Sequence, residues 1–269
     1  MFSVTSIKSY LYLLQTFTNG TELIQNLRKG GMRSDGPICR SANLRSGGSI
    51  IHPDSPGLVG TLLEVWHWRC YDDGTFYEFR KGDVIVDAGA NIGTFSLDFA
   101  RRNPSARILA FEPFPETFSC LKANVESLGL TDHIDLRNEA LGAESGHAKP
   151  IGDTDRAVDG TTQEADADDP DAVSMATLDS VLAEDGIDEI ALLKMDIEGG
   201  EEPIFEAIRP GTLAKIRCIS MEYHDNLRPG VLKLIQKRLA DTHDVRVIKE
   251  EDDEGNELPY GMLHAGRRS

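Results

Sequence analysis

The stretch "DVIVDAGANIGTFSLDFARR", residues 83–102, begins as a β-branched strand and ends as a helix. The strand runs into Asp87, and a glycine-rich turn follows it. Phe95, Phe99 and Ala100 then recur at a spacing typical of one helix face. A strand, a glycine turn and a helix in this order form the first part of a βαβ unit, so the stretch predicts a parallel sheet.

The same alternation continues to the end of the chain. Further strands are expected at 106–113, 133–142, 187–196 and 215–225, with helices at 115–130, 177–186, 202–213 and 230–242. Residues 243–250 and 258–266 resemble a closing pair of strands. The pattern therefore predicts an α/β fold, with a mostly parallel twisted sheet, helices on both faces and a C-terminal antiparallel strand pair.

The expected strands all end in polar side chains. In an open parallel sheet, ligands bind at the carboxyl ends of the strands. One rim should therefore gather five residues, which are Asp87, Glu112, Asn138, Asp196 and Glu222. We expect the functional site along this rim.

Two further segments stand apart from the regular pattern. Residues 1–75 are expected to form a helical and irregular appendage that serves as a substrate lid or docking region, followed by one domain over 76–269. Within the appendage, residues 9–17 are too short to span a membrane and predict an amphipathic docking helix, with peripheral membrane contact as the alternative. Residues 152–172 hold eight acids and one arginine, which predicts an exposed, mobile loop.

Composition excludes some partners. The formal net charge of −17 argues against nucleic acid, because phosphate binding needs a basic surface. Lysine is scarce and acids are abundant, a balance found in proteins adapted to high salt and in ordinary acidic proteins. The four cysteines lack metal-site spacing, so we expect reduced thiols in a cytoplasmic protein.

The glycine turn bears on the cofactor. A dinucleotide fingerprint G-x-G-x-x-G would start at Gly89, but Asn91 and Thr94 occupy its other two glycine positions. Glu112, at the end of the next strand, is placed to accept hydrogen bonds from the ribose hydroxyls of an adenosine cofactor. An acidic rim repels a pyrophosphate and attracts a sulfonium and an ammonium. S-adenosylmethionine is therefore favoured over NAD.

Six segments together resemble the FkbM-type family of S-adenosylmethionine-dependent methyltransferases. They are "VDAGANIGTFS" (86–96), "FEPFPETFSCLKAN" (111–124), "NEALG" (138–142), "TLDSVL" (177–182), "LLKMDIEGGE" (192–201) and "MEYH" (221–224). The resemblance covers residues 82 to about 225 and implies a Rossmann-like class I methyltransferase fold. It also implies methyl transfer to oxygen, often on a sugar or another natural-product hydroxyl.

The resemblance assigns cofactor contacts residue by residue. Four residues of the first turn would shape the methionine end of the pocket, namely Asp87, Gly89, Asn91 and Gly93. Glu112 would hold the ribose, and Asn138, Glu139 and Ala140 would flank the adenine. Asp196 would lie under the sulfonium and the acceptor.

A hydroxyl acceptor also needs a group that takes its proton. His224 is the first candidate, because the unperturbed pKa of histidine lies nearest neutrality. Asp196 and Glu198 are the competing bases. Together with Glu222 these residues could instead bind Mg²⁺, an alternative that is not favoured because such pairs arise readily at strand ends. Glu201 and its neighbour Glu202 are expected to be helix-start acids.

The sequence therefore predicts an O-methyltransferase acting on a hydroxyl, or a uronate carboxyl, of a small-molecule, glycan-linked or lipid-linked sugar. Two alternatives remain at this point. One is a nucleotide- or sugar-binding domain that kept the fold and lost activity. The other, which Asn91 and Thr94 disfavour, is an NAD-dependent oxidoreductase.

Overall fold

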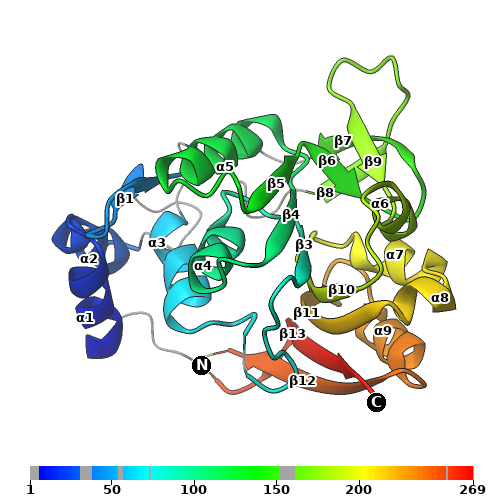
Figure 1. Cartoon of the computed structure of the whole chain (residues 1–269). Coiled ribbons are helices and arrows are strands. Elements are labelled where there is room, and N and C mark those ends of the chain that lie inside the picture. The colour runs from blue at the N-terminus through cyan, green and yellow to red at the C-terminus, as the bar shows by residue number, and fades with distance from the viewer. Residues whose placement is uncertain are drawn as a thin grey trace.

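A seven-stranded sheet forms the centre of the computed structural model, which describes residues 6–30, 38–53, 57–72, 74–151, 161–252 and 254–268 (Figure 1). Its strand order is β12-β13-β11-β10-β3-β4-β5. The strands are β3 (Val84–Ala88), β4 (Arg107–Phe111), β5 (Ile134–Arg137), β10 (Ile190–Met195), β11 (Ile216–His224), β12 (His243–Glu251) and β13 (Glu257–Arg267). The β11–β13 and β12–β13 pairs are antiparallel and the other four pairs of this sheet are parallel, so the predicted mostly parallel sheet and its closing strand pair are confirmed.

Helices cover both faces of this sheet, because successive strand residues point to opposite sides. On β3, Ile85 belongs to one apolar cluster, with α4 (Thr94–Arg102) and α5 (Pro115–Ser127), and Val86 to the other. The second cluster includes α6 (Leu178–Glu184), α7 (Glu201–Ala207), α8 (Pro210–Leu213) and α9 (Val231–Leu239). The strand order reverses between β3 and β10, so helices on the two sides of this point cover opposite faces of the sheet. An open α/β sheet binds its ligand at such a point.

The N-terminal segment packs on the first of these faces (Figure 1). It contains α1 (Ile7–Thr16), α2 (Gly20–Arg28), β1 (Ser41–Asn43), β2 (Ser49–Ile51), α3 (Leu58–Leu62) and the π-helix η1 (Leu63–His67). Leu13 of α1 and Trp66 of η1 are buried in the same apolar cluster as Phe99 of α4. Residues 6–72, where described, therefore share a core with the sheet. None of the helices that the structure describes is both long and apolar enough to cross a membrane.

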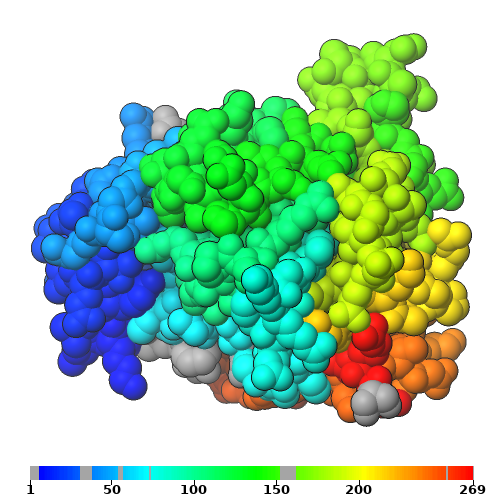
Figure 2. Space-filling view, in the orientation of Figure 1, coloured from blue at the N-terminus to red at the C-terminus, as the bar shows by residue number. Residues whose placement is uncertain are grey.

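A smaller sheet, in the order β6-β9-β7-β8, forms the green projection at the upper right of Figure 2. Its strands are β6 (Glu139–Leu141), β7 (Gly146–Ile151), β8 (Thr161–Glu164) and β9 (Val173–Ala176). Two expectations are corrected here. The strand expected at 133–142 is divided into β5 and β6, because Asn138 bonds back to two carbonyl groups and turns the chain. The loop expected at 152–172 contains β8, while residues 152–160 lie outside the described ranges.

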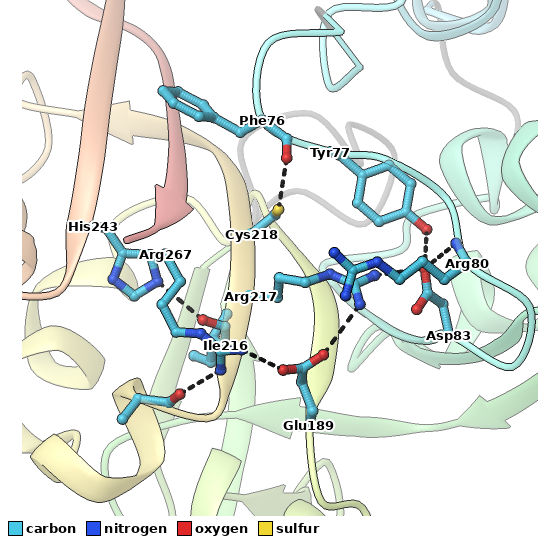
Figure 3. Close-up of polar contacts among 11 residues, drawn as sticks. Phe76, Tyr77, Arg80, Asp83, Glu189, Ile216, Arg217, Cys218, His243 and Arg267 are labelled. Atoms are coloured by element: carbon cyan, nitrogen blue, oxygen red, sulfur yellow. Dashed lines mark hydrogen bonds and ion pairs between the residues drawn. The ribbon is translucent and has the colours of Figure 1, made fainter. Parts of the chain in front are cut away.

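A polar network ties the amino ends of the strands together, away from the strand ends that carry the acidic rim (Figure 3). The Arg217 guanidinium donates to Asp83 at 2.6 Å and to Glu189 at 3.1 Å. Asp83 also accepts from the Tyr77 hydroxyl at 3.0 Å. Asp83 precedes β3, Glu189 precedes β10 and Arg217 lies in β11, so these contacts fix the alignment of the strands that carry the site.

Candidate functional site

A pocket opens at the carboxyl ends of β3, β4, β10 and β11. Eight of the residues expected at the rim or the site line it, and these are Gly89, Asn91, Glu112, Glu139, Ala140, Asp196, Glu198 and Glu222. The other expected residues stand behind the lining: Asp87 is fully buried, His224 is almost so, and Gly93 and Asn138 hold the surrounding turns. The N-terminal segment contributes Glu64, Cys70 and Tyr71 to the wall, and β8 contributes Thr162.

The turn after β3 approaches β10 so closely that it needs glycine. Gly89 has a φ of +72°, and a Cβ placed on it would lie 1.9 Å from the Asp196 carbonyl oxygen. Asn91 also has a positive φ, of +52°, and its side-chain oxygen accepts from the Ile92 amide at 2.7 Å. Asparagine tolerates this conformation because its side chain can bond locally. The turn therefore presents bare backbone to the pocket.

Glu112 receives two backbone hydrogen bonds at the far side of this turn. Its carboxylate oxygens accept from the Asn91 amide at 2.8 Å and from the Phe114 amide at 2.9 Å. Burial raises the pKa of Glu112 to about 7, although the two amides lower it. The side chain reaches the pocket, and each carboxylate oxygen has a second lone pair that can accept a hydroxyl.

Asp87 lies beneath the turn and binds a buried lysine that the sequence analysis missed. Lys194 Nζ lies 3.3 Å from Asp87 and donates to the Gly89 carbonyl at 2.7 Å. Ser96 donates to the second oxygen of Asp87 at 2.6 Å. Burial lowers the pKa of Lys194, but the carboxylates of Asp87 and Asp196 outweigh it and leave the pKa raised. The sequence feature that could have identified Lys194 as a site residue is its position as the single charged residue in the apolar run 190–195.

Tyr71 joins two strand ends through one hydroxyl, and the sequence analysis missed it too. Its oxygen lies 2.9 Å from Asp196 and 3.0 Å from Glu222, so it bridges the ends of β10 and β11. The ring also receives Lys194 Nζ at 5.1 Å from its centroid. Local patterns carry no signal for this residue, because the contact spans 125 positions of the chain.

His224 is surrounded by carboxylates. Nδ1 lies 3.0 Å from Glu201, and Nε2 lies 3.4 Å from Glu198 and 3.6 Å from Glu222. Burial lowers the pKa of His224, but these carboxylates together raise it to about 11. The imidazole thus holds a proton at neutral pH and cannot accept another, which argues against its expected role as general base. Glu201, expected as a helix-start acid, is fully buried against this imidazole.

Glu198 stands in a strained position at the pocket wall. Its φ is +49°, a conformation that glutamate rarely adopts. Burial raises its pKa to about 8, and Asp196 adds to the shift while His224 opposes it. The wall formed by β10 and β11 therefore gathers several carboxyl groups at close range, an arrangement suited to cations and to hydroxyl donors.

Comparisons with known proteins identify relatives of the chain. A family model described as the methyltransferase FkbM domain matches residues 87–251. The chain is 27% identical over 222 residues to the 31-O-demethyl-FK506 methyltransferase FkbM of Streptomyces tacrolimicus, covering 70% of this chain and 83% of that protein. It is 26% identical over 179 residues to the hexuronic acid methyltransferase AglP of Haloferax volcanii, covering 65% and 70%.

Two further matches are one sequence relative and one solved structure. The chain is 28% identical over 175 residues to the 2-O-methyltransferase NoeI of Sinorhizobium fredii, covering 58% of this chain and 69% of that protein. Among solved structures, precorrin-6y C5,15-methyltransferase of Geobacter metallireducens matches with a TM-score of 0.41 and 14% identity, covering 77% of this chain and 87% of that one.

Proposed function

The chain belongs to the FkbM family of methyltransferases, and from this premise we propose that it moves a methyl group from S-adenosylmethionine to a hydroxyl oxygen of a sugar or sugar-containing acceptor. The observation that carries the proposal is the pocket itself. One wall is the bare turn at Gly89 with Glu112 beside it, and the adjoining wall carries the carboxyl groups of Asp196 and Glu198.

The pocket suits this cofactor chemically. Glu112 can accept the two ribose hydroxyls, and Glu139 and Ala140 line the part of the pocket where we place the adenine. The sulfonium and the ammonium of the methionine moiety are positive, and the pocket wall carries Asp196 and Glu198. NAD is disfavoured by the same charges, because its pyrophosphate is negative.

Methyl transfer needs the acceptor oxygen, the methyl carbon and the sulfur in line, so positioning supplies much of the rate. The acceptor oxygen would form a bond to the methyl carbon as the carbon–sulfur bond breaks. The electron pair of the broken bond would stay on the sulfur, which leaves as S-adenosylhomocysteine. The hydroxyl proton passes to a carboxylate of the wall. We propose Asp196 as the residue that orients the acceptor and receives its proton, because the raised pKa values of Glu198, about 8, and of His224, about 11, leave both of those groups largely protonated at neutral pH.

The acceptor class follows from the charge of the wall. Sugar hydroxyls donate hydrogen bonds, and the side chains of Glu64 and Glu222 add further carboxylate acceptors to the pocket. A uronate acceptor would need no proton acceptor, but its carboxylate would be repelled by these groups. A neutral sugar hydroxyl is therefore the acceptor that the pocket favours.

Calorimetric titration with S-adenosylmethionine tests the cofactor half of the proposal. We expect saturable binding of one molecule per chain, and roughly 10- to 100-fold weaker binding by Glu112→Gln, because hydrogen bonds to a charged carboxylate contribute about 1.5–3 kcal/mol. Glu116→Gln, an exposed acid at the start of α5, serves as the matched control and should bind normally. Equal affinity in all three proteins would contradict the assigned role of Glu112.

Transfer is tested with methyl-labelled S-adenosylmethionine and a panel of neutral sugars, glycolipids and uronic acids. Label on a neutral sugar is expected, and label on uronic acids alone would overturn the hydroxyl assignment. Tight cofactor binding without transfer to any member of the panel would instead favour a binding domain that has lost activity. Binding of NAD but not of S-adenosylmethionine would favour the alternative that the protein is an NAD-dependent oxidoreductase.

A further inference from the structure

The ends of β10 and β11 place one imidazole and two carboxylates around a common point. Asp196, Glu198 and His224 each offer one ligand atom within 4.8 Å of the others. In a six-coordinate Mg²⁺ or Mn²⁺ site, bonds of about 2.1 Å separate the ligand atoms by about 3 to 4.2 Å. The observed spread therefore needs only a small contraction to hold such an ion.

The distances around His224 Nε2 suit a shared cation better than a hydrogen bond. This nitrogen lies 3.4 Å from Glu198 and 3.6 Å from Glu222. A charged N–H···O⁻ hydrogen bond is normally about 2.7–2.9 Å long. By contrast, Nδ1 makes an ordinary hydrogen bond of 3.0 Å to Glu201. The imidazole is thus anchored through Nδ1, and Nε2 faces a gap among carboxylates.

Buried oxygen atoms without partners provide a second, independent observation. Glu201 is fully buried, yet its Oε2 has no hydrogen-bond partner among the described residues, and neither has Asp196 Oδ1. An unpaired buried acceptor is costly, and Asp196 Oδ1 belongs to the cluster itself, so this atom points to a missing positive ligand there. The pairing of Glu201 with His224 also matches the carboxylate–histidine arrangement that orients metal ligands in proteins.

We propose that Asp196, Glu198 and Nε2 of His224 bind a divalent cation of the Mg²⁺ or Mn²⁺ type, with Glu201 as the positioning residue for the imidazole. The ion would displace the protons that Nε2 and the Glu198 carboxyl hold in its absence, because metal ligands must be deprotonated. Two carboxylates and one imidazole form a mixed oxygen and nitrogen ligand set that Mn²⁺ accepts. Asp196 and Glu198 both line the pocket, so the unfilled coordination positions face it. Resting on the proposed function, the site would bind acceptors through two adjacent oxygen atoms, as in a vicinal diol.

The test uses Mn²⁺ as the probe and the full chain after removal of metals with EDTA. Titration followed by electron paramagnetic resonance should show one bound ion per chain. Electron spin-echo modulation should show coupling to one imidazole nitrogen, and His224→Ala should abolish it. Absence of a stoichiometric ion, or a spectrum without nitrogen coupling in the unaltered protein, would overturn the proposal.

Variants assign the ligands without relying on turnover. Glu198→Gln should weaken Mn²⁺ binding at least tenfold, and Glu201→Gln should weaken it by about 10- to 100-fold, the usual effect of removing a carboxylate behind a ligating histidine. Glu202→Gln is the matched control, because this adjacent acid lies 3.9 Å from Arg228 and outside the cluster. Unchanged affinity in Glu198→Gln would contradict the ligand set, provided circular dichroism shows a folded protein.

Calorimetry with S-adenosylmethionine in EDTA separates the two proposals. Cofactor binding that persists in the chelator, together with failure to bind Mn²⁺, would refute the metal site and leave the proposed function standing. Loss of cofactor binding with intact Mn²⁺ coordination would refute the proposed function and leave the metal site standing. With Mn²⁺ bound, the rate of methyl transfer to a sugar with a vicinal diol is compared with the rate for its monodeoxy analogue. Equal rates would refute chelation of the acceptor.

Discussion

Glu112 carries a carboxyl group whose ionisation should control cofactor affinity. Its pKa of about 7 lies above the usual value for glutamate, mainly because of burial. Below pH 7 the group is increasingly protonated and loses acceptor capacity for the ribose hydroxyls. Affinity for S-adenosylmethionine should therefore rise with pH, by up to about tenfold per unit below pH 7, and level off above about pH 8. Calorimetry across pH 5.5–8.5 measures the profile.

Glu112→Gln provides the control for this pH dependence, because glutamine does not titrate. The variant should lose the component of the profile centred near pH 7, while effects of other acids remain. A profile of identical shape in the variant would show that another group is responsible.

Single residues also mark the limit of what the sequence predicted about the site. The strand-end rule correctly brought Glu112, Asp196 and Glu222 to one pocket, because parallel strands end at the same edge. Motif spacing could not distinguish the pocket lining from its support, so Asp87 was expected beside the cofactor but pairs with buried Lys194. Whether each lining residue contacts the cofactor stays a prediction.

Among the elements, the π-helix η1 holds the N-terminal segment to α4. Trp66 is buried, donates from its indole nitrogen to the Thr94 carbonyl at 2.8 Å and stacks near Phe17 at a ring distance of 6.2 Å. Trp66→Ala should lower the free energy of unfolding by about 3–5 kcal/mol, the usual cost of removing a large buried ring. Urea unfolding followed by circular dichroism measures this loss.

Arg69 is exposed in the folded protein, and the same variant should make the peptide bond after it easier for trypsin to cleave, because η1 and the residues after it would unfold locally more often. Trp66→Phe keeps most of the packing and removes only the hydrogen bond, so it should lose about 1 kcal/mol and resist cleavage. Rapid cleavage in both variants, or in neither, would mean that packing of the ring does not hold the segment.

The elements themselves followed well from local pattern, whereas the contacts between distant segments did not. Most strands and helices of the regular region were confirmed because apolar periodicity and glycine turns are local properties. The single helix expected at 202–213 was wrong, since the chain leaves the helical conformation at Ile208 and Arg209 and Pro210 begins a second helix. The division at Asn138 depends on bonds to residues 112 and 113 on another strand. Strand β8 contains mostly polar residues and gains its partner only from β7, so the surrounding acids predicted a loop.

At the scale of the whole molecule, the net charge of −17 should make stability depend on salt. Repulsion among the acids acts over about 10 Å at 0.1 M ionic strength but only about 3 Å at 1 M. The thermal midpoint should therefore rise by several degrees between 0.1 and 1 M NaCl. Scanning calorimetry measures it, and KCl should give the same curve if screening is the cause. A constant or falling midpoint would contradict repulsion as the dominant effect.

The contact between Gly89 and the Asp196 carbonyl restricts how the pocket can move. With backbone against backbone at this point, the turn after β3 and the end of β10 cannot slide past each other, so they must shift as one rigid body. Tyr71 is tied to the same rigid part, because its hydroxyl bonds to Asp196 and Glu222. The wall supplied by Thr162 has no such constraint, since it comes from the projecting strand β8. Movement of the pocket walls during turnover is thereby left to β8.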